Sequence, residues 1–427
     1  MTDLRTTHGC IVRTVTLDGI DSDLLSLLPS TGGFAWVRND AGFVGWGEAA
    51  RFEIAGPERF SRAQRWWSAW CEAAQVDDQV GVRGTGPVAF ASFTFDAGPQ
   101  ASAVIVPSVV VGHRAGRTWL TTVESTDLIA DPGSAAAGDT DPQRPVISGA
   151  PITWEPGTRP TEHWARAVAE AIGRIAAGEL DKVVLARDIV AQLPDTLDSA
   201  ALLERLAGAY PECWTFSVDG LLGATPELLV RRDGDRVTSR VLAGTVRSRG
   251  EESLDAAHAA ALLHSDKDLE EHEYAVHSVA EALAAHCTDL DVPSAPHVLS
   301  LANVQHLATD VTGMLADGAS ALALAASLHP TAAVCGTPTE RAAALIRELE
   351  GMDRGRYAGP VGWIDARGDG EFGIALRCAA VEDSERGPAT RLRLYAGCGI
   401  VAGSTADGEI AESEAKLDAV RRALAAG

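Results

Sequence analysis

The sequence has no excess of basic residues. Its 427 residues include 36 lysines and arginines against 59 aspartates and glutamates, which gives a formal net charge of −23. Binding to nucleic acid needs a basic surface that displaces counterions, and docking on anionic lipid needs charge of the same sign. We therefore expect no nucleic-acid partner and no membrane partner, and we interpret the acidity as favouring solubility.

Cysteine pairs and long apolar runs are absent as well. The seven cysteines form no C-x-x-C pair, and an odd, low count favours a reducing compartment over a disulfide framework. No apolar run approaches the ~18 to 20 residues of a membrane span. Residues 1–10 lack the apolar segment of a secretory signal. We expect a cytoplasmic protein that acts as a monomer.

The elements predicted from periodicity are mixed. Residues 1–150 are mainly strand and turn, with strands at 34–38, 43–46 and 103–111, one helix at 57–74 and a loop rich in Gly, Pro, Ala and Asp at 131–151. Residues 151–427 have a firmer pattern. Helices are predicted at 161–177, 200–209, 254–287 (as two helices), 339–349 and 408–425, and strands at 182–193, 214–218, 228–232, 236–242, 361–364, 371–381 and 391–401. This is an α/β (α+β) pattern without strict βαβ alternation.

Two acidic clusters stand at predicted helix starts. Asp268 and Glu271 are three residues apart, as are Glu409 and Glu412, with Lys416 one turn further on. Residues at this spacing share a helix face, so the two pairs could meet around a hard cation such as Mg²⁺. Acidic residues also favour first helical turns because of the helix dipole, and spacing alone leaves both interpretations open.

Two other stretches resemble a zinc-protease motif and a dinucleotide-binding loop, but their spacing fits neither. His272-Glu-Tyr-Ala-Val-His277 has one residue too many for a zinc-protease helix, so its two imidazoles do not share a face. Gly397-Cys-Gly-Ile-Val-Ala-Gly403 is one residue too long for a dinucleotide loop and no βαβ unit follows it.

Ten ordered motifs resemble the chorismate-utilising family, which comprises isochorismate, salicylate, anthranilate and aminodeoxychorismate synthases. The matching stretches are Lys182-Val-Val-Leu-Ala-Arg187, Gly223-Ala-Thr-Pro-Glu227, Leu242-Ala-Gly-Thr245, Lys267-Asp-Leu-Glu-Glu-His272, Val304-Gln-His-Leu-Ala-Thr309, His329-Pro-Thr331, Tyr357-Ala-Gly-Pro-Val-Gly-Trp363, Ile374-Ala-Leu-Arg377, Ala396-Gly-Cys-Gly-Ile400 and Glu409-Ile-Ala-Glu412-Ser-Glu-Ala-Lys416. The resemblance covers roughly residues 160 to 427. It implies a single large fold of layered antiparallel sheets flanked by helices, in which residues 151–427 form the catalytic region and residues 1–150 complete the core.

The resemblance also implies a role for each matching residue. Lys182 is expected to be the general base, and Glu227 the general acid in a setting that raises its pKa. Taken alone, Lys182 could equally be a strand residue with its tip in solvent. The remaining expectations are Glu271 and Glu412 as Mg²⁺ ligands helped by Asp268 and Glu409, and Gly244, Thr245, His306, Ala333, Tyr357, Arg377, Gly397 and Lys416 around the substrate, chorismate.

Three positions narrow the activity within the family. Ammonia-using relatives lack a lysine at position 182, and aminodeoxychorismate synthases carry a lysine nucleophile where this chain has Ala243. Water is therefore the implied nucleophile, and no glutaminase subunit is expected. Salicylate synthases carry Thr where this chain has Ala333, which favours release of isochorismate, although Val334 replaces the Leu common in isochorismate synthases.

The pathway stays open between menaquinone and catecholate siderophore biosynthesis. The stretch Gly42-Phe-Val-Gly-Trp-Gly-Glu48 resembles the menaquinone-type enzymes and favours the first. Two further activities stay compatible with the motifs, namely salicylate synthesis and a binding role for a homologue that has lost catalysis.

Overall fold

The computed structural model describes residues 9–18, 23–125, 151–248, 251–382 and 390–425. The loop predicted at 131–151 falls almost wholly outside these residues. The helices within them are α1 (Arg59–Ala73), α2 (Thr161–Ala176), α3 (Ser199–Ala209), α4 (Glu252–Leu262), α5 (Asp266–Ala284), α6 (Ala321–Leu328), α7 (Thr339–Leu349) and α8 (Ala406–Ala425), with a 3-10 helix, η1 (Leu24–Leu27). None of these described helices is both long enough and apolar enough to cross a bilayer.

Two large sheets organise the chain. The first runs in the order β10 (Thr153–Pro156), β11 (Lys182–Leu193), β23 (Thr390–Ile400), β22 (Cys378–Glu382), β13 (Leu221–Thr225), β12 (Trp214–Val218), β2 (Phe34–Arg38), β3 (Ala41–Trp46), β8 (Val109–Arg114), β9 (Arg117–Ser125), β1 (Cys10–Thr16) and β5 (Gln75–Asp78), with β19 (Gly336–Thr337) paired to β11. The second runs β16 (Cys287–Asp291), β18 (Val304–Leu315), β15 (Arg236–Arg247), β14 (Leu228–Asp233), β21 (Gly370–Ile374), β20 (Pro360–Asp365), β6 (Val88–Ser92), β7 (Ser102–Val106) and β4 (Ala50–Ile54), with β17 (His297–Ser300) on β18.

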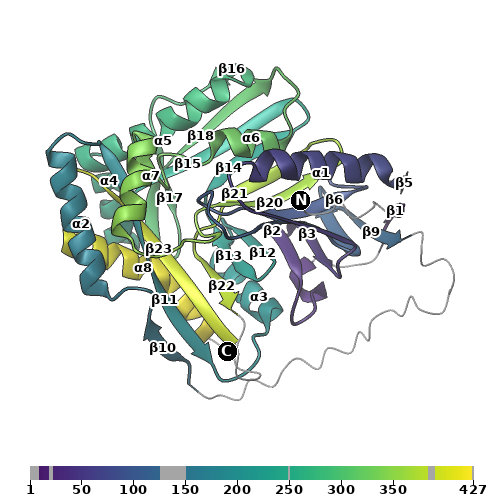
Figure 1. Ribbon diagram of the computed structural model, residues 1–427, viewed down its shortest axis with the longest axis horizontal. Coiled ribbons are helices and arrows are strands. Elements are labelled where there is room, and N and C mark those ends of the chain that lie inside the picture. The colour runs from purple at the N-terminus through teal and green to yellow at the C-terminus, as the bar shows by residue number, and fades with distance from the viewer. Residues whose placement is uncertain (1–8, 19–22, 126–150, 249–250, 383–389, 426–427) are drawn as a thin grey trace.

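The strand pairs are antiparallel throughout the described chain apart from β1 with β5. The predicted class, a mixed fold of layered antiparallel sheets flanked by helices, is confirmed. Strands from the first 125 residues join both sheets, since β2 pairs with β12 and β6 pairs with β20. In Figure 1, β11 and β23 run side by side, and α5 and α6 lie beside the second sheet.

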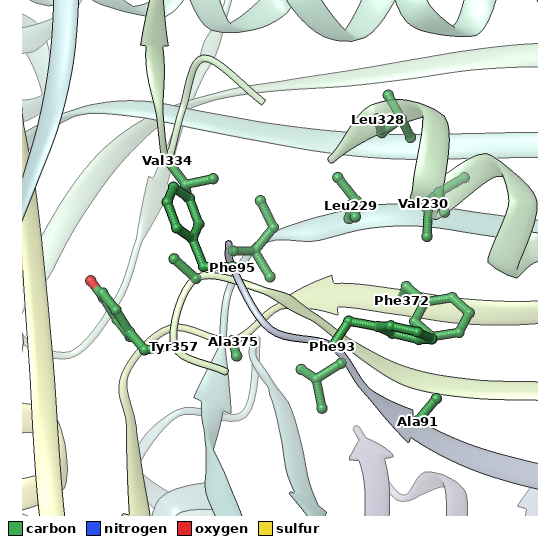
Figure 2. Close-up of a cluster of buried hydrophobic side chains, with 14 of the residues drawn as sticks. Ala91, Phe93, Phe95, Leu229, Val230, Leu328, Val334, Tyr357, Phe372 and Ala375 are labelled. Atoms are coloured by element: carbon green, nitrogen blue, oxygen red, sulfur yellow. The ribbon is translucent and has the colours of Figure 1, made fainter. Parts of the chain in front are cut away.

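The core between these layers is aromatic and continuous. Phe93 and Phe372 are fully buried, with ring centroids 6.5 Å apart. Figure 2 shows that this cluster also includes Phe95, Val334 and Tyr357. Because Tyr357 and Val334 border the candidate site described below, apolar packing that begins in the first hundred residues reaches that site.

Most predicted elements are found with boundaries within a few residues. The split of the long helical segment is confirmed, because Ser265 caps α5 and its Oγ accepts a hydrogen bond from the backbone N–H of Asp268 at 3.3 Å. This cap fixes where α5 begins, and it places Asp268 and Glu271 in the first turns of that helix.

Two predicted strands are wrong as single elements. The range 371–381 is divided into β21 of the second sheet and β22 of the first, and the range 103–111 is divided into β7 and β8. Arg377 lies at the first break with φ +48°. Pro107, which has no N–H to donate to a strand ladder, lies at the second. Apolar residues continue through both breaks, so periodicity could not reveal that the chain changes sheets.

Candidate active site

A cavity of about 50 Å³ lies between residues of both sheets and of helices α5 and α8. The sequence-predicted residues that line it are Glu227, Gly244, Thr245, Glu271, His306, Ala333, Tyr357, Arg377, Gly397 and Lys416. Lys182, Asp268, Glu409 and Glu412 are not in its lining. Lys182 contacts the lining residue Glu271, and Glu412 contacts the lining residue Lys416.

Lys182 is the first residue of β11 and is completely buried. Its Nζ lies 3.1 Å from Oε1 of Glu271, whose side chain lines the cavity. The alternative of a strand lysine with its tip in solvent is therefore wrong. A buried lysine side chain needs a polar partner, and Glu271 near the start of α5 supplies one.

Glu227 lies in the short connection between β13 and β14 and is 4% exposed. Burial raises the pKa of its carboxyl group to about 8, although the positive charges of Lys182, Arg377 and Lys416 act in the opposite direction. A carboxyl group in this setting holds its proton near neutral pH. That is the state that a proton donor requires.

His306 and Arg377 form a hydrogen-bonded pair in the cavity wall. The Arg377 guanidinium donates to Nε2 of His306 at 2.9 Å, and Nδ1 of His306 lies 3.3 Å from the carbonyl of Gly244 and 3.1 Å from Oγ1 of Thr245. Burial, followed by Arg377 and Lys416, holds the pKa of His306 well below its usual value. The imidazole is therefore neutral, with its proton on Nδ1, and it orients Arg377 toward the cavity.

Lys416 on α8 also lines the cavity. Its Nζ donates to the Gly397 carbonyl at 2.8 Å and to Oε1 of Glu412 at 2.6 Å. Burial is the largest single effect and lowers the pKa of Lys416, but the interactions with Glu412 and Cys398 together outweigh it and the pKa is raised. Lys416 is thus a permanent positive charge. The Tyr357 hydroxyl lies close to the backbone of Gly397, because a Cβ built on that glycine would be 3.0 Å from the hydroxyl oxygen. These groups form a surface suited to a carboxylate.

Of the four predicted metal-binding carboxylates, Glu409 and Glu412 lie close together near the start of α8, whereas Asp268 and Glu271 of α5 are outside this group among the described residues. Ligand atoms of Glu409, Glu412 and Cys398 lie within 4.8 Å of one another. Oε1 of Glu409 pairs with Lys267 at 3.2 Å, whereas Oε2 is buried without a hydrogen-bond partner. Burial and the charge of Glu412 raise the pKa of Glu409. An unpartnered carboxylate oxygen among neighbouring acids fits a hard divalent cation.

Two glycines allow the backbone to approach these acids closely. A Cβ on Gly399 would lie 2.1 Å from Oε1 of Glu271, so glycine leaves room for that carboxylate in its present position. Gly244 has φ +70° and sits at an irregularity in the pairing of β15 with β18, and a Cβ there would lie 3.0 Å from the Cβ of Asp268. Both strands therefore pass against the first turns of α5 without a side chain in between.

Two further lining residues, Ala243 and Val334, had already served to narrow the activity. The other lining residues had no site role from the sequence, and they are Val184, Pro226, Leu242, Arg354, Ala358, Leu376 and Gly399. Most are apolar residues that look like ordinary core. Arg354 carried a signal, because Glu350 precedes it by four residues directly after a predicted helix.

Comparison with known proteins agrees with this geometry. The model of the chorismate binding enzyme family matches residues 34–425. Isochorismate synthase DhbC of Bacillus subtilis is 41% identical over 275 residues, which cover 62% of this chain and 68% of that protein. Putative isochorismate synthase MenF of Mycobacterium tuberculosis is 35% identical over 388 residues, 87% of this chain and 95% of that protein.

A solved structure extends the likeness to three dimensions. MenF, the menaquinone-specific isochorismate synthase from Escherichia coli, superposes with a TM-score of 0.77 at 25% sequence identity, covering 98% of this chain and 95% of that one. The family match spans most of the chain and includes the cavity lining. The protein is therefore an enzyme that belongs to the chorismate binding family.

Proposed function

We propose that the protein is an isochorismate synthase that converts chorismate to isochorismate. The observation that carries this proposal is the buried carboxyl group of Glu227, which lines the cavity and holds its proton. Lys182 is buried next to the same cavity, where it contacts the lining residue Glu271. A base and an acid placed on one cavity can add water at one ring position and remove a hydroxyl group at another. The relatives described above are named as isochorismate synthases, and they include both DhbC and MenF enzymes.

The proposed reaction balances in atoms and protons. Lys182 takes a proton from water, whose oxygen bonds to C2 of chorismate. The ring double bonds shift, and the C4 hydroxyl group leaves as water with the proton of Glu227. Arg377, Tyr357 and the Gly397 backbone hold the enolpyruvyl carboxylate. The enclosed volume is below the ~300 Å³ of small-molecule sites, so bordering side chains such as Glu271 must move when chorismate binds.

We propose Mg²⁺ as the cofactor, held by Glu271 and Glu412 with help from Asp268 and Glu409. Its chemistry would be to neutralise the ring carboxylate of chorismate and orient the ring. The support is the donor set, which consists of carboxylates from two helix starts with one buried oxygen unpartnered. Burial and nearby acids also raise the pKa of Asp268, as expected where negative charge is concentrated.

Position 333 bears on which product is released, and position 182 bears on whether a glutaminase subunit is needed. Ala333 lines the cavity with a methyl group, where salicylate synthases carry a threonine hydroxyl, and this favours release of isochorismate. Because Lys182 activates water, no glutaminase subunit is needed to supply ammonia. We propose menaquinone biosynthesis as the pathway, with catecholate siderophore biosynthesis as the alternative, since relatives of both kinds are similar to this chain.

Product analysis tests the proposal directly. The pure protein is incubated with chorismate and Mg²⁺, and the products are separated by chromatography. Isochorismate alone supports the assignment, and salicylate with pyruvate replaces it with the salicylate synthase reaction. The absence of turnover, with or without ammonia, refutes both and favours a binding protein.

A further inference from the structure

Glu350 and Arg354 form a buried ion pair next to the cavity. Glu350 directly follows α7, and Arg354 lies four residues later in the loop that leads to Tyr357. Their side chains are 1% and 3% exposed. Nε of Arg354 donates to Oε2 of Glu350 at 2.9 Å, and a second guanidinium nitrogen contacts Oε1. Such a pair places the guanidinium in one fixed orientation.

The pair reaches the strand that carries Lys182 at two points. Arg354 donates to the Val184 carbonyl at 2.8 Å, and Glu350 accepts from the Ala186 N–H at 2.7 Å. These backbone groups lie two and four residues after Lys182 along β11.

The same guanidinium also reaches the loop that carries Ala333. Arg354 donates to the Val334 carbonyl at 2.9 Å. One side chain therefore connects the strand of the proposed base with the loop that bears the proposed product-determining residue.

The contacts fill a gap in the sheet. On the side of β11 away from β23, β19 pairs only with Lys182 and Val183, and β10 begins to pair at Ile189. Buried backbone groups between these points need other partners. The Val184 carbonyl and the Ala186 N–H find them in the ion pair, which takes the place of a neighbouring strand.

Phe95 completes the arrangement from the N-terminal part of the chain. Its ring lies beneath the guanidinium, with Cζ of Arg354 4.2 Å from the ring centroid, and its N–H donates to the Gly355 carbonyl at 2.9 Å. Figure 2 shows Phe95 beside Val334 in the cluster that also contains Tyr357. The aromatic face favours a flat guanidinium over an ammonium group.

Stability alone does not account for this choice of residues. A buried ion pair pays for the desolvation of two charges, and well-packed apolar residues are often as stable in its place. What apolar residues cannot do is hold two carbonyls and one N–H from separate segments in one geometry.

We propose that Glu350 and Arg354 are positioning residues that fix β11 at Lys182 relative to the Ala333–Val334 loop. This inference rests on the proposed isochorismate synthase activity. The pair acts through the backbone of β11 and of the loop, and the chemical step depends on it because the base must stand at a set distance from the ring.

The test compares Arg354→Lys with Arg356→Lys. The lysine at 354 keeps a positive charge beside Glu350 but cannot reach both carbonyls. Arg356 is a matched control. It lies two residues away and is also largely buried, and its hydrogen bonds and its 3.1 Å ion pair go to Val218 and Asp219.

Two readouts are followed in each variant. Arg354→Lys is expected to lower kcat by ~10- to 100-fold while KM for chorismate changes by less than about threefold, whereas Arg356→Lys keeps kcat within about twofold. Hydrogen exchange is expected to accelerate at residues 184–186 and 333–335 in Arg354→Lys alone. Glu350→Gln, which keeps the shape and the Ala186 contact, is expected to retain more kcat than Arg354→Lys.

The outcomes separate the two proposals. Normal kcat in Arg354→Lys, or an equal loss of kcat in both arginine variants, overturns the positioning role. If the wild-type protein makes no isochorismate, the proposed function fails and hydrogen exchange decides alone. Unchanged exchange at 184–186 and 333–335 then overturns the inference, and local acceleration in Arg354→Lys alone upholds it.

Discussion

Replacement of Glu227 by glutamine should make the protein more stable at alkaline pH and inactive. The carboxyl group has a pKa of about 8 in the folded protein, against a usual value of 4.5, because burial disfavours its charged form. Between these values the unfolded chain loses the proton and the folded protein keeps it. Stability therefore falls as pH rises, by about 1.4 kcal/mol per pH unit up to pH 8, and is constant above that.

Glutamine removes this pH dependence because it does not titrate. Relative to wild type, Glu227→Gln should gain about 3 kcal/mol of unfolding free energy between pH 6 and pH 9. The free energies are measured by urea denaturation at both pH values. In the same variant kcat should fall ~10²- to 10⁴-fold, since the amide cannot donate a proton to the leaving hydroxyl group. The wild-type kcat/KM should decline as pH rises through about 8.

Glu371→Gln is the matched control. Glu371 is also a buried glutamate, but Arg231 and Arg83 outweigh its burial and hold its pKa at about 2. Its replacement should reduce stability equally at pH 6 and pH 9, because the folded and unfolded carboxyl groups are both ionised at each pH. If Glu227→Gln showed the same pH-independent change as Glu371→Gln, the raised pKa of Glu227 and its role as the acid would both be refuted.

Three other substitutions test the remaining roles. Lys182→Ala should lower kcat ~10²- to 10⁴-fold in a steady-state assay, and full activity would refute the assigned base. Gly399→Ala should weaken Mg²⁺ binding measured by calorimetry, because the new methyl group would lie 2.1 Å from Oε1 of Glu271, and unchanged affinity would remove Glu271 from the ligand set. Ala333→Thr should shift the products toward salicylate and pyruvate in chromatography, and an unchanged product ratio would show that this position does not determine the product.

The local elements followed from the sequence because their signals are local. The β-branched run at 182–193 is β11 to the residue, and the capping box at Ser265 divides α4 from α5. The order of the motifs predicted the family, because a motif is defined by residue identities along the chain. None of this required knowledge of which strands pair.

Tertiary structure decided the placement of the groups. The break at Arg377, where the chain leaves one sheet for the other, has apolar residues on both sides. The pairing of Lys182 with Glu271 joins residues 89 positions apart, and the contact of Phe95 with Arg354 links the two halves of the chain.

The pKa of Glu227 is also decided by the tertiary structure. It depends on the complete burial of the carboxyl group among three positive charges, which come from β11, α8 and the β21–β22 connection. The sequence by itself determined which chemical groups were present and where most of the predicted helices and strands begin. Only the packing of the two sheets decided which groups lost water and which charges met, because burial and distance are properties of the folded chain and not of its local pattern.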